Sequence, residues 1–262
     1  MELPTILWEQ DGPLVRLTLN RPEAANAMDL QMMKDLLDAA IECEDNDNIR
    51  AVLLTGSGKM FTPGGDLGWL ARNPDSVSTA IKQSTAFMNA AIARFVRMPK
   101  PLVTCINGHA AGAGIGLAVM GDYIVCAESA RISPAFTAAG LSPDGGTSYF
   151  LPRLIGQRRA KELFLTNRSL TAEEALEWGL INAVAPDAEA LKVAEDMALK
   201  LANGATRAYG TVKTLLNSSD GNSLETHLHQ EISGIAGNAA SADGREGIAA
   251  FMEKRRPEFS GK

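Results

Sequence analysis

The stretch LVTCI at residues 102–106, followed by NGHAAGAGIG at residues 107–116, decides the fold of this chain. The first five residues are a short apolar run, which is typical of a strand buried on both faces. Glycines follow where the strand ends, and a helical pattern over residues 112–120 begins among them. The start of a helix offers free N–H groups to a negatively charged oxygen. The stretch therefore predicts an oxyanion site, close packing through Gly112 and Gly116, or both together.

The same alternation of strand and helix recurs along the first part of the chain. Strands are predicted at residues 14–19, 51–55 and 123–126, and helices from Asp29 onward and over residues 77–97. After Gly156 the patterns are mostly helical, at residues 158–165, 171–178, 189–202, 207–216, 224–235 and 244–255. Thr171 and Glu174 fit a capping box at the start of one of these helices. We expect one α/β core with a helical tail, which packs on its own core or on a neighbour's.

Composition excludes several classes of protein. A hydrophobic share of 45% in 262 residues is enough for a large core, and a net charge of −6 argues against a nucleic-acid surface. The beginning of the chain lacks the pattern of an export signal, and no apolar run predicts a membrane span. Cys43, Cys105 and Cys126 have neither zinc-ligand nor disulfide-framework spacing. We therefore expect a cytoplasmic protein with free thiols, without membrane or nucleic-acid partners.

Metal and nucleotide sites are also not indicated. His109, His227 and His229 lack ligand spacing to one another or to a cluster of carboxylates. The run GSGKM at residues 56–60 lacks the spacing of a phosphate-binding loop, and the glycines at 112–116 lack the third glycine of a dinucleotide fingerprint.

Two further glycine segments have both a structural and a chemical interpretation. FTPGGDL at residues 61–67 is an ordinary glycine turn or a loop that aims an N–H into a cleft. LSPDGGT at residues 141–147 contains Asp144, which is a turn aspartate or an acid placed for chemistry. Taken alone, each segment favours the structural interpretation.

Taken together in order, these motifs resemble the crotonase (enoyl-CoA hydratase/isomerase) superfamily. The resemblance runs from about Leu14 to the C-terminus and includes the ending REGIAAFMEKR at residues 245–255. It implies an α/β fold, a spiral of ββα units in two roughly perpendicular sheets with a C-terminal helical trimerisation region. Residues 1–195 would be the core with the acyl-CoA site and residues 196–262 the trimerisation region. Homotrimers, or hexamers made of two trimers, are implied.

The resemblance also implies a site for an acyl-coenzyme A thioester. Coenzyme A would be part of the substrate, and no separate cofactor or metal is implied. The backbone N–H groups of Gly65 and Ala113 would bind the thioester oxygen, and such a donor can lower a barrier by about 3 kcal/mol. The residues implied in substrate and coenzyme A binding are Ala24, Ala25, Ala27, Phe61, Gly64, Asp66, Leu67 and Phe136, with Phe251 and Lys254 near the phosphates.

One departure from the superfamily pattern predicts the reaction. Members that hydrate a double bond carry two glutamates, and the matching positions here are Gly116 and Ala135. Asp144 matches the position of the single acid in isomerases of the superfamily. These include the Δ3,Δ2-enoyl-CoA isomerases and the ring-epoxide/oxepin isomerase branch of phenylacetate breakdown, which is the nearest resemblance. We therefore expect an enoyl-CoA isomerase in which Asp144 is the single acid and base.

Three alternatives remain open at the level of sequence. They are a hydratase-like activity, a 4-chlorobenzoyl-CoA dehalogenase-like activity and a non-catalytic scaffold with the same fold. Dehalogenation would use Asp144 as a nucleophile. Ala80 and Phe136 stand where that enzyme has a histidine and a tryptophan, which argues against it. Asp144 together with Gly65 argues against a scaffold.

Overall fold

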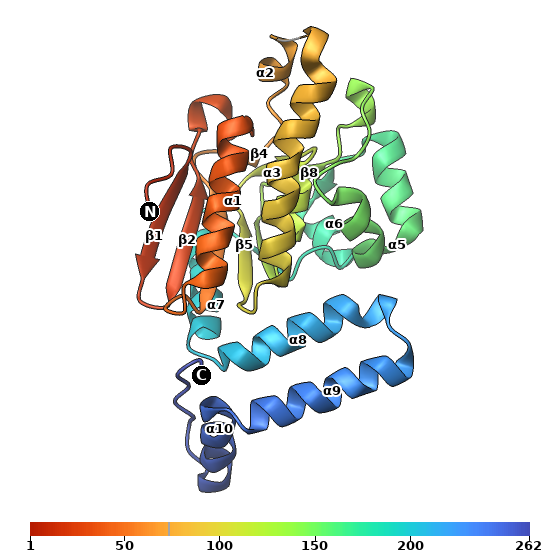
Figure 1. The fold of residues 1–262 in the computed structure, drawn as a ribbon. Helices are drawn as coiled ribbons and strands as arrows, with labels where there is room; N and C mark the ends of the chain where they lie inside the picture. The colour runs from red at the N-terminus through yellow and green to blue at the C-terminus, as the bar shows by residue number, and fades with distance from the viewer. Residues whose placement is uncertain (73) are drawn as a thin grey trace.

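The computed structural model describes residues 1–72 and 74–262, and a six-stranded sheet forms its core (Figure 1). β1 is antiparallel to β2, and every other pair of neighbours is parallel. The strands predicted from apolar runs are confirmed to within one residue at each end. In sheet order the strands are β1 (Ile6–Asp11), β2 (Leu14–Leu19), β3 (Ala51–Gly56), β5 (Leu102–Ile106), β7 (Tyr123–Ala127) and β10 (Ala183–Ala185).

Helices cover this sheet. α1 (Leu30–Asp45) and α3 (Val77–Arg97) pack on each other in front of the strands in Figure 1. α7 (Ala190–Ala202) packs against β3, β5 and β7, and its alanines at every fourth position are buried, so the helix approaches the strands closely. With both faces covered, every residue of β5 is buried. This burial explains why the strand is apolar apart from Thr104.

A second sheet is built from shorter strands. Its order is β4 (Met60–Thr62), β6 (His109–Ala111), β8 (Arg131–Ser133) and β9 (Leu170–Thr171). β4, β6 and β8 each follow a strand of the first sheet after a tight turn. At one turn an added Cβ on Gly108 would lie 2.1 Å from the carbonyl oxygen of Lys59, so a side chain does not fit there.

Each pair of strands leads into a helix, which makes the repeated ββα units that the resemblance implies. The pair β3–β4 leads to the short α2 (Leu67–Ala71) and to α3, β5–β6 leads to α4 (Gly114–Val119), and β7–β8 leads to α5 (Thr147–Thr166). α5 is interrupted at Gly156, whose backbone is not helical. The remaining short elements are η1 (Pro22–Ala24), η2 (Pro74–Ser76), η3 (Thr137–Ala139), η4 (Ser219–Gly221) and α6 (Ala172–Glu177), which begins with the predicted capping box.

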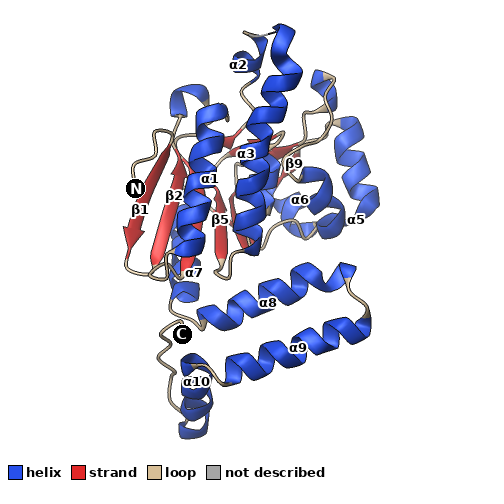
Figure 2. Cartoon of the chain, viewed as in Figure 1, coloured by secondary structure: helices blue, strands red, loops and turns tan. Residues whose placement is uncertain are grey.

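The last three helices project away from the sheets (Figure 2). They are α8 (Thr206–Ser218), α9 (Leu224–Ala239) and α10 (Ala242–Glu253). The expected division between residues 195 and 196 lies inside α7, which packs on the core sheet. The helical extension therefore begins at α8.

Lys213 connects α8 to the core through an ion pair and hydrogen bonds. Its Nζ lies 2.8 Å from Oδ2 of Asp122 and donates to the carbonyl oxygens of Lys100 at 2.9 Å and Phe95 at 3.3 Å. Burial lowers the pKa of Lys213 and raises the pKa of Asp122, and the attraction between the two charges opposes both shifts. The ion pair joins the extension to the end of β7 nearest to it.

The structure also places the cysteines and His109. All three cysteines are unpaired and buried, and burial raises the pKa of Cys43 to about 12. His109 is exposed at the start of β6. In the described part of the chain, no helix combines the length and apolar character needed to cross a membrane.

Candidate active site

A cavity of about 230 Å³ lies where the predicted motifs meet. It is bounded by the segment after β4, the first half of α3, the turn before α4 and the segment 135–144 that precedes α5. Six residues proposed from the sequence line it: Gly65, Asp66, Leu67, Ala113, Phe136 and Asp144.

The N–H groups of Gly65 and Ala113 are the candidate oxyanion donors. Among the described residues neither donates a hydrogen bond. Met28 forms an isolated bridge with Gly65, in which the N–H of Met28 donates to the carbonyl of Gly64 and the N–H of Asp66 donates to the carbonyl of Met28. Because successive backbone groups alternate in direction, the N–H of Gly65 points away from Met28.

Gly64 brings the two donors close together. Its φ is +96°, and a Cβ there would lie 2.9 Å from both the carbonyl oxygen of Ala111 and the backbone nitrogen of Ala113. A side chain at this position would push the segment after β4 away from the turn before α4. Gly64 is buried and does not line the cavity, so the structure shows its part in backbone geometry, while its contact with substrate stays a prediction.

Asp144 reaches the same cavity from the other side. A Cβ on the next residue, Gly145, would lie 3.0 Å from the carbonyl oxygen of Ala113, which places this segment directly beside the second donor. Oδ1 of Asp144 is buried without a hydrogen-bond partner in the described residues. Burial raises the pKa of Asp144 above its usual range, and its own N–H opposes the shift to a smaller extent.

The turn around Asp144 does not depend on this carboxylate. The N–H and hydroxyl of Thr147 donate to the backbone carbonyl of Asp144, at 3.1 and 2.8 Å. A buried acid with an unpartnered oxygen costs stability, and such groups concentrate at functional sites. The geometry thus favours the chemical interpretation of Asp144.

Neither of the positions that match the two hydratase glutamates carries an acid. A Cβ on Gly116 would lie 1.8 Å from the carbonyl oxygen of Gly145, so no side chain fits there. Ala135 lines the cavity with only a methyl group, in a left-handed conformation with φ of 57°. The close contact at Gly116 also holds the Asp144 segment against α4.

Asp66 is a second carboxylate at the cavity wall, and its oxygens are engaged. Oδ1 accepts the N–H of Trp69 at 2.9 Å and so caps α2. Oδ2 lies 3.4 Å from the guanidinium of Arg21. Its interactions therefore differ from those of Asp144, whose Oδ1 has no partner in the part of the chain that the structure describes.

The expected coenzyme A residues are only partly brought to the cavity. Ala24, Ala25 and Ala27 lie in and after η1 and are half-buried, close in sequence to Met28. The contact of Phe61 with coenzyme A stays a prediction, and in the structure the residue is fully buried in the core.

Phe251 and Lys254 do not reach the cavity within one chain. They lie at the end of α10, on the far side of α8 and α9 from the cavity (Figure 1). The side chain of Phe251 is 82% exposed. A single chain therefore does not bring these two residues to the other site residues.

The structure adds wall residues that the sequence did not single out. Met28, Met33, Leu70, Ile81 and Leu141 line the cavity, together with Trp69. Met33 and Ile81 follow the helical periodicity of α1 and α3. That pattern alone predicts burial, so it does not distinguish a cavity wall from core.

Comparison with known proteins agrees with this geometry. The sequence profile described as enoyl-CoA hydratase/isomerase matches residues 9–262. The chain belongs to the enoyl-CoA hydratase/isomerase family. It is 39% identical over 260 residues to the 1,2-epoxyphenylacetyl-CoA isomerase of Escherichia coli K12, and the match covers 98% of each chain.

Members of the family with other activities are also similar. The chain is 32% identical to the 4-chlorobenzoyl coenzyme A dehalogenase-2 of an Arthrobacter species, over 94% of this chain and 90% of the relative. The crystal structure of an enoyl-CoA hydratase from Polaromonas sp. JS666 superposes with a TM-score of 0.93 at 34% identity, covering 97% and 99% of the two chains. These matches show the crotonase fold and an acyl-CoA enzyme family, while the named activities differ.

Proposed function

We propose that this enzyme is an enoyl-CoA isomerase that shifts a double bond with Asp144 as its single acid and base. The observation that carries the proposal is the buried oxygen of Asp144, in a cavity shared with the N–H groups of Gly65 and Ala113; within residues 1–72 and 74–262 none of these three groups has a hydrogen-bond partner. Proton removal next to a thioester needs a base and a site for the negative charge that forms on the carbonyl oxygen. Both are available here.

The reaction proceeds in two proton transfers. The carboxylate of Asp144 removes a proton from C2 of a 3-enoyl-CoA, and the electron pair of that bond delocalises onto the thioester oxygen. The N–H groups of Gly65 and Ala113 bind the resulting dienolate. Asp144, now protonated, returns the proton to C4, and the double bond moves from C3–C4 to C2–C3. The carboxylate is regenerated and no water is consumed.

The site is less suited to hydration. Adding water needs one group to activate the water and another to deliver a proton to the neighbouring carbon. Gly116 and Ala135 supply neither group, and Asp66 is held by Arg21 and by the N–H of Trp69. The site therefore supports chemistry that requires a single acid.

Ring-epoxide isomerisation is the second candidate, and the 39% identity to the 1,2-epoxyphenylacetyl-CoA isomerase favours it. That substrate also carries a thioester carbonyl. The cavity wall includes the aromatic side chains of Trp69 and Phe136, which suit a ring.

The proposal includes an assembly of three chains, or six as two trimers. Phe251 and Lys254 lie away from the cavity of their own chain, and they would meet coenzyme A, bound along Ala24, Ala25 and Ala27, only at a neighbouring copy. Lys254 would provide a positive charge to the phosphates.

A spectrophotometric screen of acyl-CoA thioesters tests the function. We expect 3-hexenoyl-CoA to be converted to the conjugated 2-enoyl thioester, without water addition to crotonyl-CoA or halide release from 4-chlorobenzoyl-CoA. Turnover of 1,2-epoxyphenylacetyl-CoA alone would select the second candidate. Efficient hydration, halide release, or tight binding without any turnover would each contradict both isomerase proposals.

A further inference from the structure

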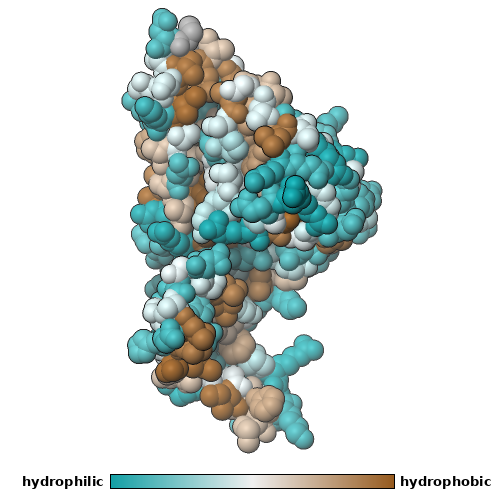
Figure 3. Space-filling view, turned by 90° about the vertical axis from the view of Figure 1, so that its right-hand side faces the viewer, coloured by the Kyte–Doolittle hydropathy of each residue, from teal (hydrophilic) through white to brown (hydrophobic). Residues whose placement is uncertain are grey.

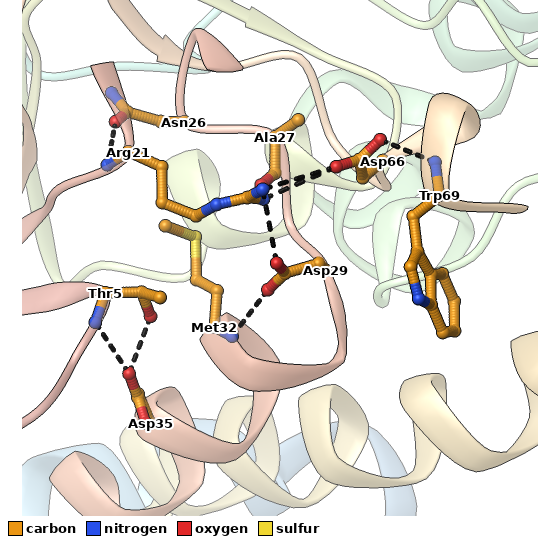
Figure 4. Close-up of polar contacts among 9 residues, drawn as sticks. All are labelled: Thr5, Arg21, Asn26, Ala27, Asp29, Met32, Asp35, Asp66 and Trp69. Carbon is orange, nitrogen blue, oxygen red and sulfur yellow. Dashed lines mark hydrogen bonds and ion pairs between the residues drawn. The ribbon is translucent and has the colours of Figure 1, made fainter. Parts of the chain in front are cut away.

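Arg21, just beyond the end of β2, connects two other segments beside the cavity, residues 27–29 and the segment of Asp66 (Figure 4). Its guanidinium lies 3.2 Å from Oδ2 of Asp29 and 3.4 Å from Oδ2 of Asp66, and it donates to the carbonyl oxygen of Ala27. The side chain of Arg21 is only 18% exposed.

Both carboxylates that Arg21 contacts are helix caps. Oδ1 of Asp29 accepts the N–H of Met32 at 3.0 Å at the start of α1, and Oδ1 of Asp66 accepts the N–H of Trp69 at the start of α2. One cation therefore connects the first turns of two helices.

The position of Asp66 gives this arrangement a chemical consequence. Asp66 directly follows the oxyanion donor Gly65, and both residues line the cavity. The carboxylate of Asp66 is mostly shielded, with 16% of its side chain exposed, so water screens its charge poorly. Without a counter-ion, such a negative charge would oppose the negative charge that develops on a bound thioester oxygen.

We infer that Arg21 is a positioning residue that neutralises Asp66 and thereby lets the N–H of Gly65 stabilise an enolate. Asp66 is needed to cap α2 and so to place Trp69 in the cavity wall, but its charge is unfavourable there. Arg21 removes the effect of that charge while Asp66 keeps its hydrogen bond. The inference deepens the proposed function and rests on it for its role in turnover.

The charge explanation is separable from a purely mechanical one. Asparagine caps a helix as well as aspartate does, but it carries no charge. Replacing Asp66 by Asn should therefore restore function to a chain that lacks Arg21, if the loss comes from the uncompensated carboxylate. If Arg21 only held the two segments in position, replacing Asp66 by Asn would restore neither the pKa of the bound ligand nor kcat.

The test uses acetoacetyl-CoA, whose enolate absorbs in the near ultraviolet, bound to the full-length enzyme. Wild-type protein, Arg21→Met and the Arg21→Met, Asp66→Asn double variant are titrated with pH, and kcat and KM are measured with 3-hexenoyl-CoA. We expect Arg21→Met to raise the pKa of the bound acetoacetyl-CoA by about one unit. We also expect kcat to fall about tenfold with a smaller change in KM. In the double variant, both the pKa of the bound acetoacetyl-CoA and kcat should return most of the way to their wild-type values.

Arg16→Met is the matched control. Arg16 also contacts two carboxylates, with Glu9 at 2.8 Å and Glu195, and it does not line the cavity. We expect its replacement to leave the pKa of the bound acetoacetyl-CoA unchanged. If Arg21→Met does not fold, Arg21→Gln with and without Asp66→Asn provides the same comparison, because glutamine keeps polar hydrogen-bonding groups but carries no charge.

The outcomes separate this inference from the proposed function. An unchanged pKa of bound acetoacetyl-CoA in the Arg21 variants, or no recovery in the double variant, would overturn the inference. If wild-type enzyme turns over no 3-enoyl-CoA but the ligand pKa still depends on Arg21 as described, the proposed function fails and the inference stands.

Discussion

At the scale of single residues, the raised pKa of Asp144 determines how activity should depend on pH. Burial favours the protonated form, while proton removal requires the carboxylate. We expect kcat/KM for isomerisation to fall on the acid side with an apparent pKa above the ~3.9 of an ordinary aspartate. A pH–rate profile measures this directly, and activity maintained down to the range of an ordinary aspartate would contradict the assignment.

The same burial predicts that Asp144 lowers stability at neutral pH. Since the folded-state pKa is raised, the folded chain binds the proton more tightly than the unfolded chain does. Stability is then highest below the unfolded-state pKa of ~3.9 and falls as pH rises through the folded-state pKa. Asp144→Asn should raise Tm at pH 7, and the difference should disappear under acidic conditions. A lower Tm for the variant at pH 7 would count against this account.

Much of the site follows from the sequence, but exact contacts do not. The glycines around residues 65 and 113 and the acid at 144 carry local signals, and the structure places all three in one cavity. Phe61 is an apolar residue, and residue type alone does not distinguish a side chain that contacts a ligand from one that packs in the core. Arg21 is a single arginine before a proline, and its bridging of Asp29 and Asp66 depends on segments that only the fold brings together.

At the scale of elements, short apolar or alternating runs predicted four strands of the first sheet, and helical periodicity predicted the major helices, whereas β1 and β10 were not predicted. The strands of the second sheet are two or three residues long, and such runs carry no periodicity. Their pairing depends on tight turns such as the one at Gly108. The ββα repeat therefore came from the family resemblance rather than from the patterns themselves.

The attachment of α8 to the core should depend on Lys213. Lys213→Met would leave Asp122 partly buried without its counter-charge, and we expect a loss of about 2 kcal/mol in the free energy of unfolding. Denaturant unfolding measures this change. Lys192→Met is the control, because Lys192 pairs with Asp196 in an exposed pair whose removal should have no measurable effect. Equal stability of the two variants would contradict the role given to Lys213.

At the scale of the whole molecule, the C-terminal helices expose an apolar stripe. Figure 3 shows hydrophobic side chains gathered over the lower part of the molecule, which these helices form. On α9, the side chains at helical spacing are between 47% and 71% exposed; they are Leu224, Leu228, Ile232 and Ile235. Exposed apolar patches of this kind commonly mark interaction surfaces.

The proposed trimer would cover this stripe. We expect wild-type protein to have the mass of three or six chains in light scattering, and Ile232→Asp to shift it toward single chains. The variant should also bind coenzyme A more weakly, since Phe251 and Lys254 would no longer reach a neighbouring cavity. A wild-type protein that remains a single chain at micromolar concentration would contradict the assembly.

The most direct test of the central claim is the isomerisation of 3-hexenoyl-CoA by Asp144→Asn. Asparagine keeps the size of the side chain and cannot accept the C2 proton, so the account predicts a fall in kcat of about 10³-fold. Coenzyme A affinity should stay within about twofold of the wild type, because the oxyanion donors are backbone groups. Isomerisation within about tenfold of the wild-type rate would show that another group carries the proton, which would contradict the claim.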